Sequence, residues 1–144
     1  MASERSGTDM VWAVPRTDVL LKVLGGPYRS ELVGTAFRLT QALLDCGATV
    51  QVWACGDATG LTSTALGDTL PVNLLDRDRS YPSTAALVRA LVTGHPGRLS
   101  WYACRFCCQE RGRSAQIAQV RMRPPARFWE HVDAAGKVLV LGAS

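Results

Sequence analysis

The chain alternates between continuous apolar runs and segments in which apolar residues recur at helical spacing. The run DVLLKVL at residues 18–24 contains β-branched side chains and ends at a Gly-Gly-Pro turn, which predicts a strand buried on both faces. From Ser30 to Gly47 apolar residues recur every three or four positions, which predicts an amphipathic helix with a serine N-cap. Residues 48–55 predict a second strand. Strand, helix and strand in this order build a parallel sheet with right-handed crossovers.

The second half of the chain continues this alternation after a less regular middle. Residues 58–82 are rich in Gly, Asp, Thr and Ser, and we expect a partly helical surface excursion there that could form a lid. Residues 83–94 predict a helix with a capping serine, and residues 98–104 predict a strand that leads into a short helix. A last helix begins within the PPARF segment, and residues 137–142 predict the closing strand.

These elements predict one domain of the α/β class. Its architecture would be a three-layer sandwich with a mostly parallel sheet of about four or five strands and a flavodoxin-like topology. Residues 1–16 are polar and irregular, so we expect a flexible N-terminal arm followed by a single domain over residues 17–144. With 144 residues, of which 47% are hydrophobic, the chain can bury one sizeable core and has little room for a second.

Composition and charge narrow the classes of partner. No segment approaches the ~18–20 apolar residues of a membrane span, and the N-terminus lacks the apolar core of a secretory signal, so we expect a cytoplasmic protein without a membrane partner. The net charge is +4. The arginines of the C-terminal half are Arg105, Arg111, Arg113, Arg121, Arg123 and Arg127. They would suit a small anion or an acidic protein, whereas the lack of interleaved aromatic residues disfavours nucleic acid.

Three of the five cysteines fall within the stretch WYACRFCCQERG, as Cys104, Cys107 and Cys108. An odd, clustered set in a reducing compartment argues against a disulfide framework and favours catalysis, metal binding or burial. Cys104 ends a predicted strand and opens a predicted helix. Unsatisfied backbone amides and the neighbouring Arg105 would favour its thiolate, which is the nucleophilic form of cysteine.

Two other segments are expected at the same edge of the sheet, because ligands of open α/β sheets bind at the carboxyl ends of the strands. One is the loop that follows the first strand at Gly25 and Gly26. The other contains Cys55 and Asp57, which follow the second strand. Together with Cys104 they predict a pocket, although Asp57 is more simply explained as a turn residue.

The order and spacing of these segments resemble the DsrE/DsrF/TusD-like sulfur-relay family. The resemblance rests on LLKVLGGPYRSELVGTAFRLTQALLDCGATVQVWACGDA, and on Cys104 followed by a short helix and the Arg-Gly pair of ERG at residues 110–112. It covers residues 18–112 and the closing strand. The fold implied is the DsrE/YchN-like sandwich.

The resemblance implies a sulfur carrier or sulfurtransferase-like protein without a cofactor. Cys104 alone would accept a sulfane sulfur as a persulfide and pass it on by thiol exchange. Separately from the resemblance, the C-x-x-C spacing makes Cys107 a candidate thiol to resolve a Cys104 persulfide or disulfide. The resemblance also implies a pocket wall formed by Gly25, Gly26, Pro27 and Tyr28. Arg29 and Arg105 would stabilise the anion on charge grounds. Expected partners are sulfur donor and acceptor proteins or small thiols, and family members assemble as trimers, hexamers or hetero-oligomers, which favours a homo-oligomer.

Several alternatives stay open. Cys107 and Cys108 stand where the family has small apolar residues, and Cys108 in particular is explained by burial in the core. Cys104 and Cys107 form a C-x-x-C, which is also typical of thiol redox sites. Zinc is a third possibility, with Cys55, Cys104, Cys107 and His131 as candidate ligands. A non-catalytic regulatory or binding subunit with the same fold is the rival from another functional class.

The last helix carries one further expectation. Phe128, Trp129 and Val132 are expected to form its buried stripe. Glu130 and His131 would then face the solvent.

Overall fold

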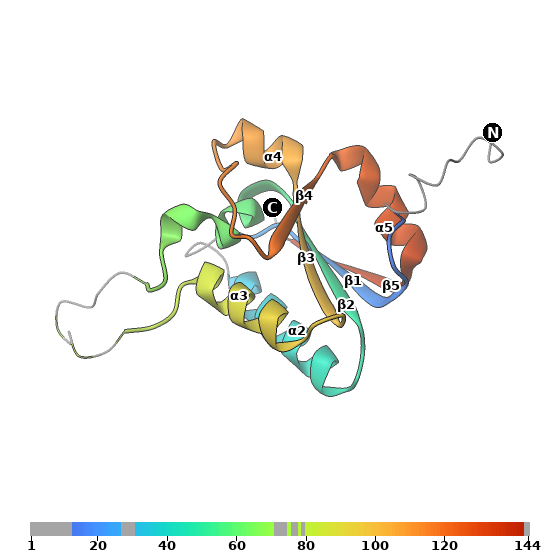
Figure 1. Ribbon diagram of the computed structural model, residues 1–144, viewed down its shortest axis with the longest axis horizontal. Coiled ribbons are helices and arrows are strands. Elements are labelled where there is room, and N and C mark those ends of the chain that lie inside the picture. The colour runs from blue at the N-terminus through green and yellow to red at the C-terminus, as the bar shows by residue number, and fades with distance from the viewer. Residues whose placement is uncertain (1–12, 27–30, 71–74, 76–77, 79, 143–144) are drawn as a thin grey trace.

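The computed structural model of the chain describes residues 13–26, 31–70, 75, 78 and 80–142 (Figure 1). Its centre is a five-stranded sheet in which all neighbouring strands are parallel. The strands are β1 (Thr17–Val23), β2 (Val50–Ala54), β3 (Leu99–Cys104), β4 (Val120–Arg123) and β5 (Ala135–Leu141). The α/β class and the parallel sheet predicted from the sequence are therefore confirmed.

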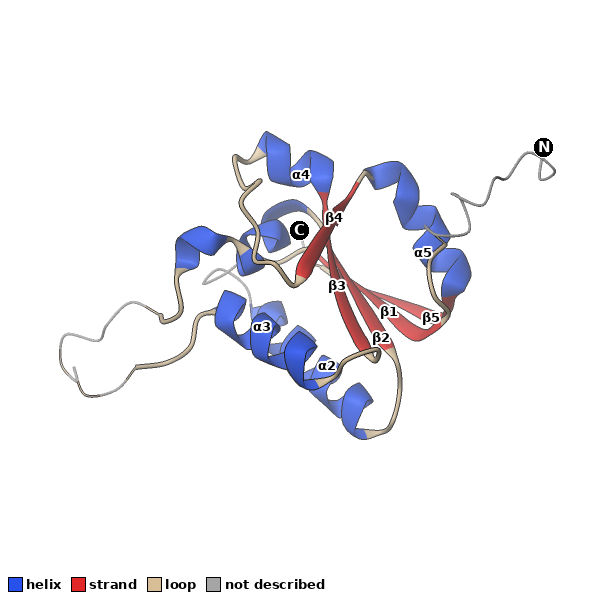
Figure 2. Cartoon of the chain, viewed as in Figure 1, coloured by secondary structure: helices blue, strands red, loops and turns tan. Residues whose placement is uncertain are grey.

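Helices cover both faces of this sheet. The α-helices are α2 (Glu31–Asp45), α3 (Thr84–Gly94), α4 (Arg105–Glu110) and α5 (Phe128–Ala134), and the 3-10 helices are η2 (Gly56–Thr62), η3 (Thr64–Leu66) and η4 (Pro125–Arg127). Helices α2 and α3 lie on one face and α5 on the other, with α4 at the end of β3 (Figure 2). The result is a three-layer sandwich. No helix in the described ranges is both long and apolar enough to cross a bilayer.

The strand order is β4-β3-β2-β1-β5. The chain steps outward from β1 to β4 and then returns over α5 to place β5 beside β1. Flavodoxin has the order 2-1-3-4-5, in which the second strand, not the last, lies outside the first. The expected flavodoxin-like topology is therefore correct for the layers and the strand direction, and wrong for the strand order.

The local signals in the sequence account for most elements. The Ser83 side chain caps α3 by accepting a hydrogen bond of 3.1 Å from the Ala86 amide. Strand β5 begins at Ala135, two positions before the predicted start. Strand β4 was not assigned from the sequence, because its four residues alternate apolar and basic side chains on the edge of the sheet.

The excursion after β2 differs from the prediction at its start. The stretch from Ala58 to Thr62 is buried, and Ala58 and Leu61 belong to the core. This part of the chain packs against both α3 and α4, so it is an interior element and not a surface loop. Residues 71–74, 76–77 and 79 lie outside the described residues, and a lid over the pocket stays a prediction.

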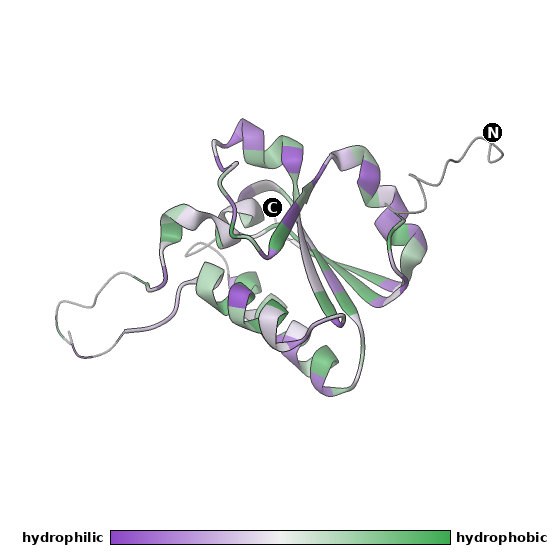
Figure 3. Cartoon of the chain, in the orientation of Figure 1, coloured by the Kyte–Doolittle hydropathy of each residue, from purple (hydrophilic) through white to green (hydrophobic). Residues whose placement is uncertain are grey.

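The two faces of the sheet have different cores. The face under α2 and α3 is mainly aliphatic, with members such as Leu21, Val23, Val52 and Leu99. The opposite face, under α5, carries the smaller cluster of Leu20, Trp53, Tyr102 and Cys104. Strands β1, β2 and β3 are mostly buried, as expected for strands covered on both faces, and Figure 3 shows hydrophobic colour along much of the sheet centre.

The predicted orientation of the last helix was wrong for two residues. His131 is 1% exposed, whereas Trp129 is 68% exposed. The His131 ring packs edge-on against Trp53 and Tyr102, at centroid distances of 5.1 and 4.4 Å. Its Nδ1 lies 2.9 Å from Oε1 of Gln51, a polar residue of β2 on the same face. This buried partner satisfies one polar atom of the imidazole and so makes its burial possible.

Candidate functional site

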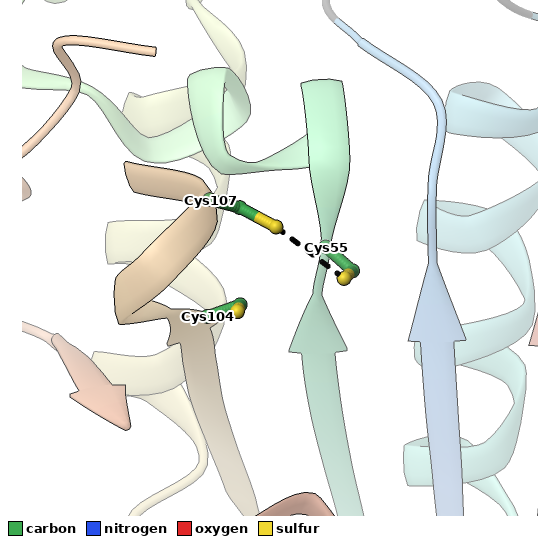
Figure 4. Close-up of side chains that lie close together, drawn as sticks. All are labelled: Cys55, Cys104 and Cys107. Carbon is green, nitrogen blue, oxygen red and sulfur yellow. Dashed lines mark hydrogen bonds between the residues drawn. The ribbon is translucent and has the colours of Figure 1, made fainter. Parts of the chain in front are cut away.

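Three cysteine side chains converge at the carboxyl edge of the sheet (Figure 4). The Sγ atoms of Cys55, Cys104 and Cys107 all lie within 4.8 Å of one another. The Sγ atoms of Cys55 and Cys107 are 3.6 Å apart, which is within the range of a hydrogen bond involving sulfur. We call these three residues the thiol cluster.

The fold explains this convergence residue by residue. Cys55 directly follows β2, Cys104 is the last residue of β3, and the register pairs Ala54 with Ala103 just before them. Because side chains alternate along a strand, Cys55 and Cys104 share the face of Trp53 and Tyr102. Cys107 lies three residues after Cys104, and positions i and i+3 at the start of a helix lie on one side.

Cys107 is the thiol most disposed to ionise. Burial raises its pKa, but a hydrogen bond from the Gly56 amide, the thiols of Cys104 and Cys55, and the charge of Arg111 outweigh it. The net direction of the Cys107 pKa is downward. Since Cys107 is also partly exposed, it combines thiolate character with access, which are the two requirements of a reactive cysteine.

Its two partners in the cluster have the opposite character. Burial raises the pKa of Cys55 to about 11, and the hydrogen bond with Cys107 adds to the effect. Cys104 is 2% exposed, and this burial raises its pKa. The backbone amides of Cys107 and Phe106 act in the opposite direction and lower the pKa, but burial is the larger effect. The cluster therefore combines one thiol whose pKa is lowered, Cys107, with two whose pKa values are raised.

The remaining cysteines lie outside the cluster. Cys108 is completely buried within the aliphatic core, and burial raises its pKa to about 11. Its predicted role as a core residue is confirmed. Cys46 is exposed after the end of α2, so it provides a natural reference thiol.

Arg111 and Arg113 form the charged rim of the site. Arg111 Nε lies 3.3 Å from Asp57 Oδ1, and Arg113 donates a 2.9 Å hydrogen bond to the Asp57 carbonyl. Asp57 thus holds two guanidinium groups beside η2. A Cβ at Gly60 would lie 2.7 Å from Arg113 Nη1, so the absence of a side chain there makes room for that guanidinium.

Two of the predicted pocket residues lie in the loop that follows β1. Gly25 and Gly26 follow β1 at the same edge, and a Cβ at Gly26 would lie 3.0 Å from the Asp57 Cβ. This loop therefore leaves the sheet in close contact with Asp57. Pro27, Tyr28 and Arg29 lie outside the described residues, so their predicted roles stay predictions. Arg105 is exposed, and its Nη2 reaches the Met122 carbonyl at 3.4 Å.

The thiol cluster offers three sulfur ligands, a set that suits a soft metal ion such as zinc with one open position. His131 was a candidate fourth ligand. Its Nδ1 instead contacts Gln51, and within the described residues its ring does not join the group of converging ligand atoms. A metal site would therefore have to be built on the three thiols.

Sequence reasoning found all three members of the cluster but missed two groups that set their chemistry. Arg111 belongs to the Arg-Gly pair and directly follows the short helix, and its position four residues after Cys107 is a signal that could have identified it. The Gly56 amide gave a weaker signal. Gly56 has a φ of +58°, a conformation that favours glycine, and it follows Cys55 directly.

The comparisons with known proteins support the fold. The crystal structure of the ychN protein from E. coli superposes with a TM-score of 0.69 at 19% sequence identity. The match covers 86% of this chain and 98% of that chain. No family model matches the chain, and no curated protein matches it in sequence. The DsrE/YchN-like fold implied by the sequence resemblance is thereby confirmed at the level of architecture.

Proposed function

We propose that this chain is a sulfur-relay protein of the DsrE-like type, which carries sulfane sulfur as a persulfide within the thiol cluster. The observation that carries this proposal is the convergence of three Sγ atoms within 4.8 Å at the carboxyl edge of the sheet. Among them Cys107 is partly exposed and has a lowered pKa, whereas the pKa values of Cys55 and Cys104 are raised. The DsrE/YchN-like fold supports it independently.

The proposed reaction is a thiol exchange in two steps. The Cys107 thiolate attacks the outer sulfur of a donor persulfide, a new S–S bond forms on Cys107, and the donor thiolate leaves. An acceptor thiolate then attacks the outer sulfur, and Cys107 leaves as a thiolate. Arg111 is placed to stabilise the anion in both steps, because its charge already favours the Cys107 thiolate.

The family resemblance assigns the carrier role to Cys104 by position, whereas exposure and electrostatics favour Cys107 for the first attack. We therefore propose that both residues belong to the site, with Cys107 as the thiol that meets the donor. Arg105 and Arg29 keep their proposed roles as anion-stabilising groups on charge alone, and Gly25, Gly26 and Asp57 are proposed to line the pocket.

The proposed partners are a sulfur donor and an acceptor, either proteins or small thiols, in the cytoplasm. A homo-oligomer is also proposed. Its support is the edge strand β5, where Val138, Leu139 and Val140 are exposed next to one another, since such apolar edges are typically covered by another chain.

The test is intact-mass spectrometry after incubation with a cysteine desulfurase and cysteine. At early times, before any later step discharges the sulfur, wild type and Cys46→Ser should each show a gain of one sulfur, because Cys46 is exposed and does not belong to the thiol cluster. Cys107→Ser should show no gain. The Cys104→Ser variant distinguishes a carrier role of Cys107 from a carrier role of Cys104. Gain of sulfur by Cys107→Ser and loss by Cys104→Ser would move the carrier to the position given by the resemblance.

A second candidate function, soft-metal binding, is favoured by the spacing of the three Sγ atoms. Native mass spectra of the same preparation distinguish it. A retained zinc ion that is lost in the Cys55→Ser variant, together with no sulfur gain, would replace the sulfur-relay proposal. The same spectra report the number of chains in the assembly.

A further inference from the structure

Cys55 is a member of the thiol cluster for which the relay chemistry provides no task. Its Sγ lies 3.6 Å from the Cys107 Sγ, and it comes from a different segment, the junction between β2 and η2. We propose that Cys55 is a resolving cysteine that attacks sulfurated Cys107, releases hydrosulfide and leaves a Cys55–Cys107 disulfide. This inference rests on the proposed function, because the Cys107 persulfide is its substrate.

The step balances without an external oxidant. The Cys55 Sγ forms a bond to the Cys107 Sγ, and the bond from Cys107 to the outer sulfur breaks. The outer sulfur leaves with the electron pair and takes the proton of the Cys55 thiol, so it departs as hydrosulfide. It is reduced from the sulfane to the sulfide level while the two cysteines are oxidised to a disulfide. Small thiols would restore the two cysteines through ordinary thiol–disulfide exchange.

The position of Cys55 suits this role better than that of Cys104. Cys104 is 2% exposed beneath the strand–helix junction, whereas Cys55 and Cys107 are both partly exposed, which gives the hydrosulfide a path to solvent. The two Sγ atoms already contact each other. Closing that contact to the S–S bond length of about 2 Å requires a shift of about 1.5 Å, which side-chain rotation can supply.

The electrostatics of the cluster fit the order of events. Because burial and the contact with Cys107 raise the pKa of Cys55, it starts as a protonated thiol and can donate a hydrogen bond to the Cys107 thiolate. It therefore does not compete with Cys107 for the donor sulfur. It also brings the proton that the leaving sulfur requires.

The experiment uses the reduced, full-length chain under nitrogen with glutathione persulfide as the probe. Released hydrosulfide is measured over time, and the non-reduced protein is examined by intact mass and peptide mapping. Wild type should release one hydrosulfide per chain and lose two hydrogens, with the disulfide mapped to Cys55 and Cys107. Intact mass separates this product from a mixed disulfide with glutathione, which would be heavier.

Cys55→Ser is the key variant, because serine keeps a hydrogen-bond donor beside Cys107 but cannot form the disulfide. It should retain the added sulfur and release hydrosulfide at least about tenfold more slowly than wild type. The matched control Cys46→Ser should behave like wild type. Mapping of the disulfide in wild type tests the inference without any variant, so poor folding of Cys55→Ser would not remove the test.

The outcomes separate the inference from the function on which it rests. Release at the wild-type rate by Cys55→Ser, or a disulfide mapped to Cys104 and Cys107, would overturn the role of Cys55. Retention of the added sulfur by wild type to the end of the time course, with neither hydrosulfide nor disulfide, would overturn it too, while the carrier proposal stands. No sulfur uptake and no disulfide in any form of the protein would overturn both.

Discussion

The two faces of the sheet are built for different purposes. The face under α2 and α3 is a broad aliphatic core, to which β1, β2 and β3 contribute residues such as Leu21, Val52 and Leu99. The face under α5 is narrower and holds aromatic rings, a buried histidine and, at its carboxyl edge, the thiol cluster. The first face is suited to stability alone, whereas the second accepts polar groups in the interior and places reactive sulfur beside them.

The largest effect expected from this division is on stability. Leu21 is 0% exposed in the aliphatic core, so Leu21→Ala should lower the free energy of unfolding by about 2–5 kcal/mol. The folded variant should still react with iodoacetamide at Cys107 at the wild-type rate, because the thiol cluster lies on the other face. Urea denaturation and alkylation kinetics measure the two quantities.

Leu75→Ala is the matched control for this prediction. Leu75 is 98% exposed, so its truncation should change the unfolding free energy by less than about 0.5 kcal/mol. A Leu21→Ala variant whose alkylation rate at Cys107 changes as much as its stability would show that the two faces are not independent.

The buried histidine should make stability depend on pH. Burial, together with the charges of Arg123 and Arg127, lowers the pKa of His131 to about 4, whereas its value before folding is 6.5. Between these values the unfolded chain binds a proton that the folded chain does not, so stability falls as pH drops from about 6.5 to about 4. The loss should approach about 3 kcal/mol, since one pKa unit corresponds to about 1.4 kcal/mol.

This loss is measured by urea denaturation at a series of pH values, in wild type and in His131→Gln. The variant cannot take up the proton, so its stability curve should be flatter over the same interval. If the unfolding free energy falls equally in both proteins, the pH dependence belongs to groups other than His131. The buried histidine would then not be the reason for any loss of stability on the α5 face.

How far the sequence predicts each face follows from how local its signals are. Mainly apolar runs at residues 18–24 and 48–55 were sufficient to predict strands, and therefore the aliphatic core. The α5 face was harder, because Trp129 and His131 exchange their expected environments. A helix of seven residues carries little periodicity, and the burial of His131 depends on Gln51, which lies eighty positions earlier.

The thiol cluster shows the same limit. Strand ends located Cys55 and Cys104, and helical spacing located Cys107. Which of the three ionises most readily could not be predicted, because the answer depends on the Gly56 amide and on Arg111 as they come together in the fold.

The smallest expected effect concerns the contribution of Arg111 to the lowered pKa of Cys107. Arg111→Gln should raise the Cys107 pKa by less than about one unit, because the guanidinium is one of several groups that favour the thiolate and is partly exposed. The rate of Cys107 alkylation at neutral pH should fall by less than about tenfold. The pH dependence of iodoacetamide labelling, read by peptide mass, measures the shift.

Arg105→Gln is the matched comparison, since it removes the same charge from the opposite end of α4. Its guanidinium contacts the Met122 carbonyl, whereas the charge that lowers the Cys107 pKa is that of Arg111, so Arg105→Gln should slow Cys107 labelling less than Arg111→Gln does. If Arg105→Gln instead has the larger effect, the charge that matters acts from the Cys104 side of the cluster. The reactive thiol would then be Cys104, as the family resemblance implies, and the reaction would take place at a thiol that is only 2% exposed.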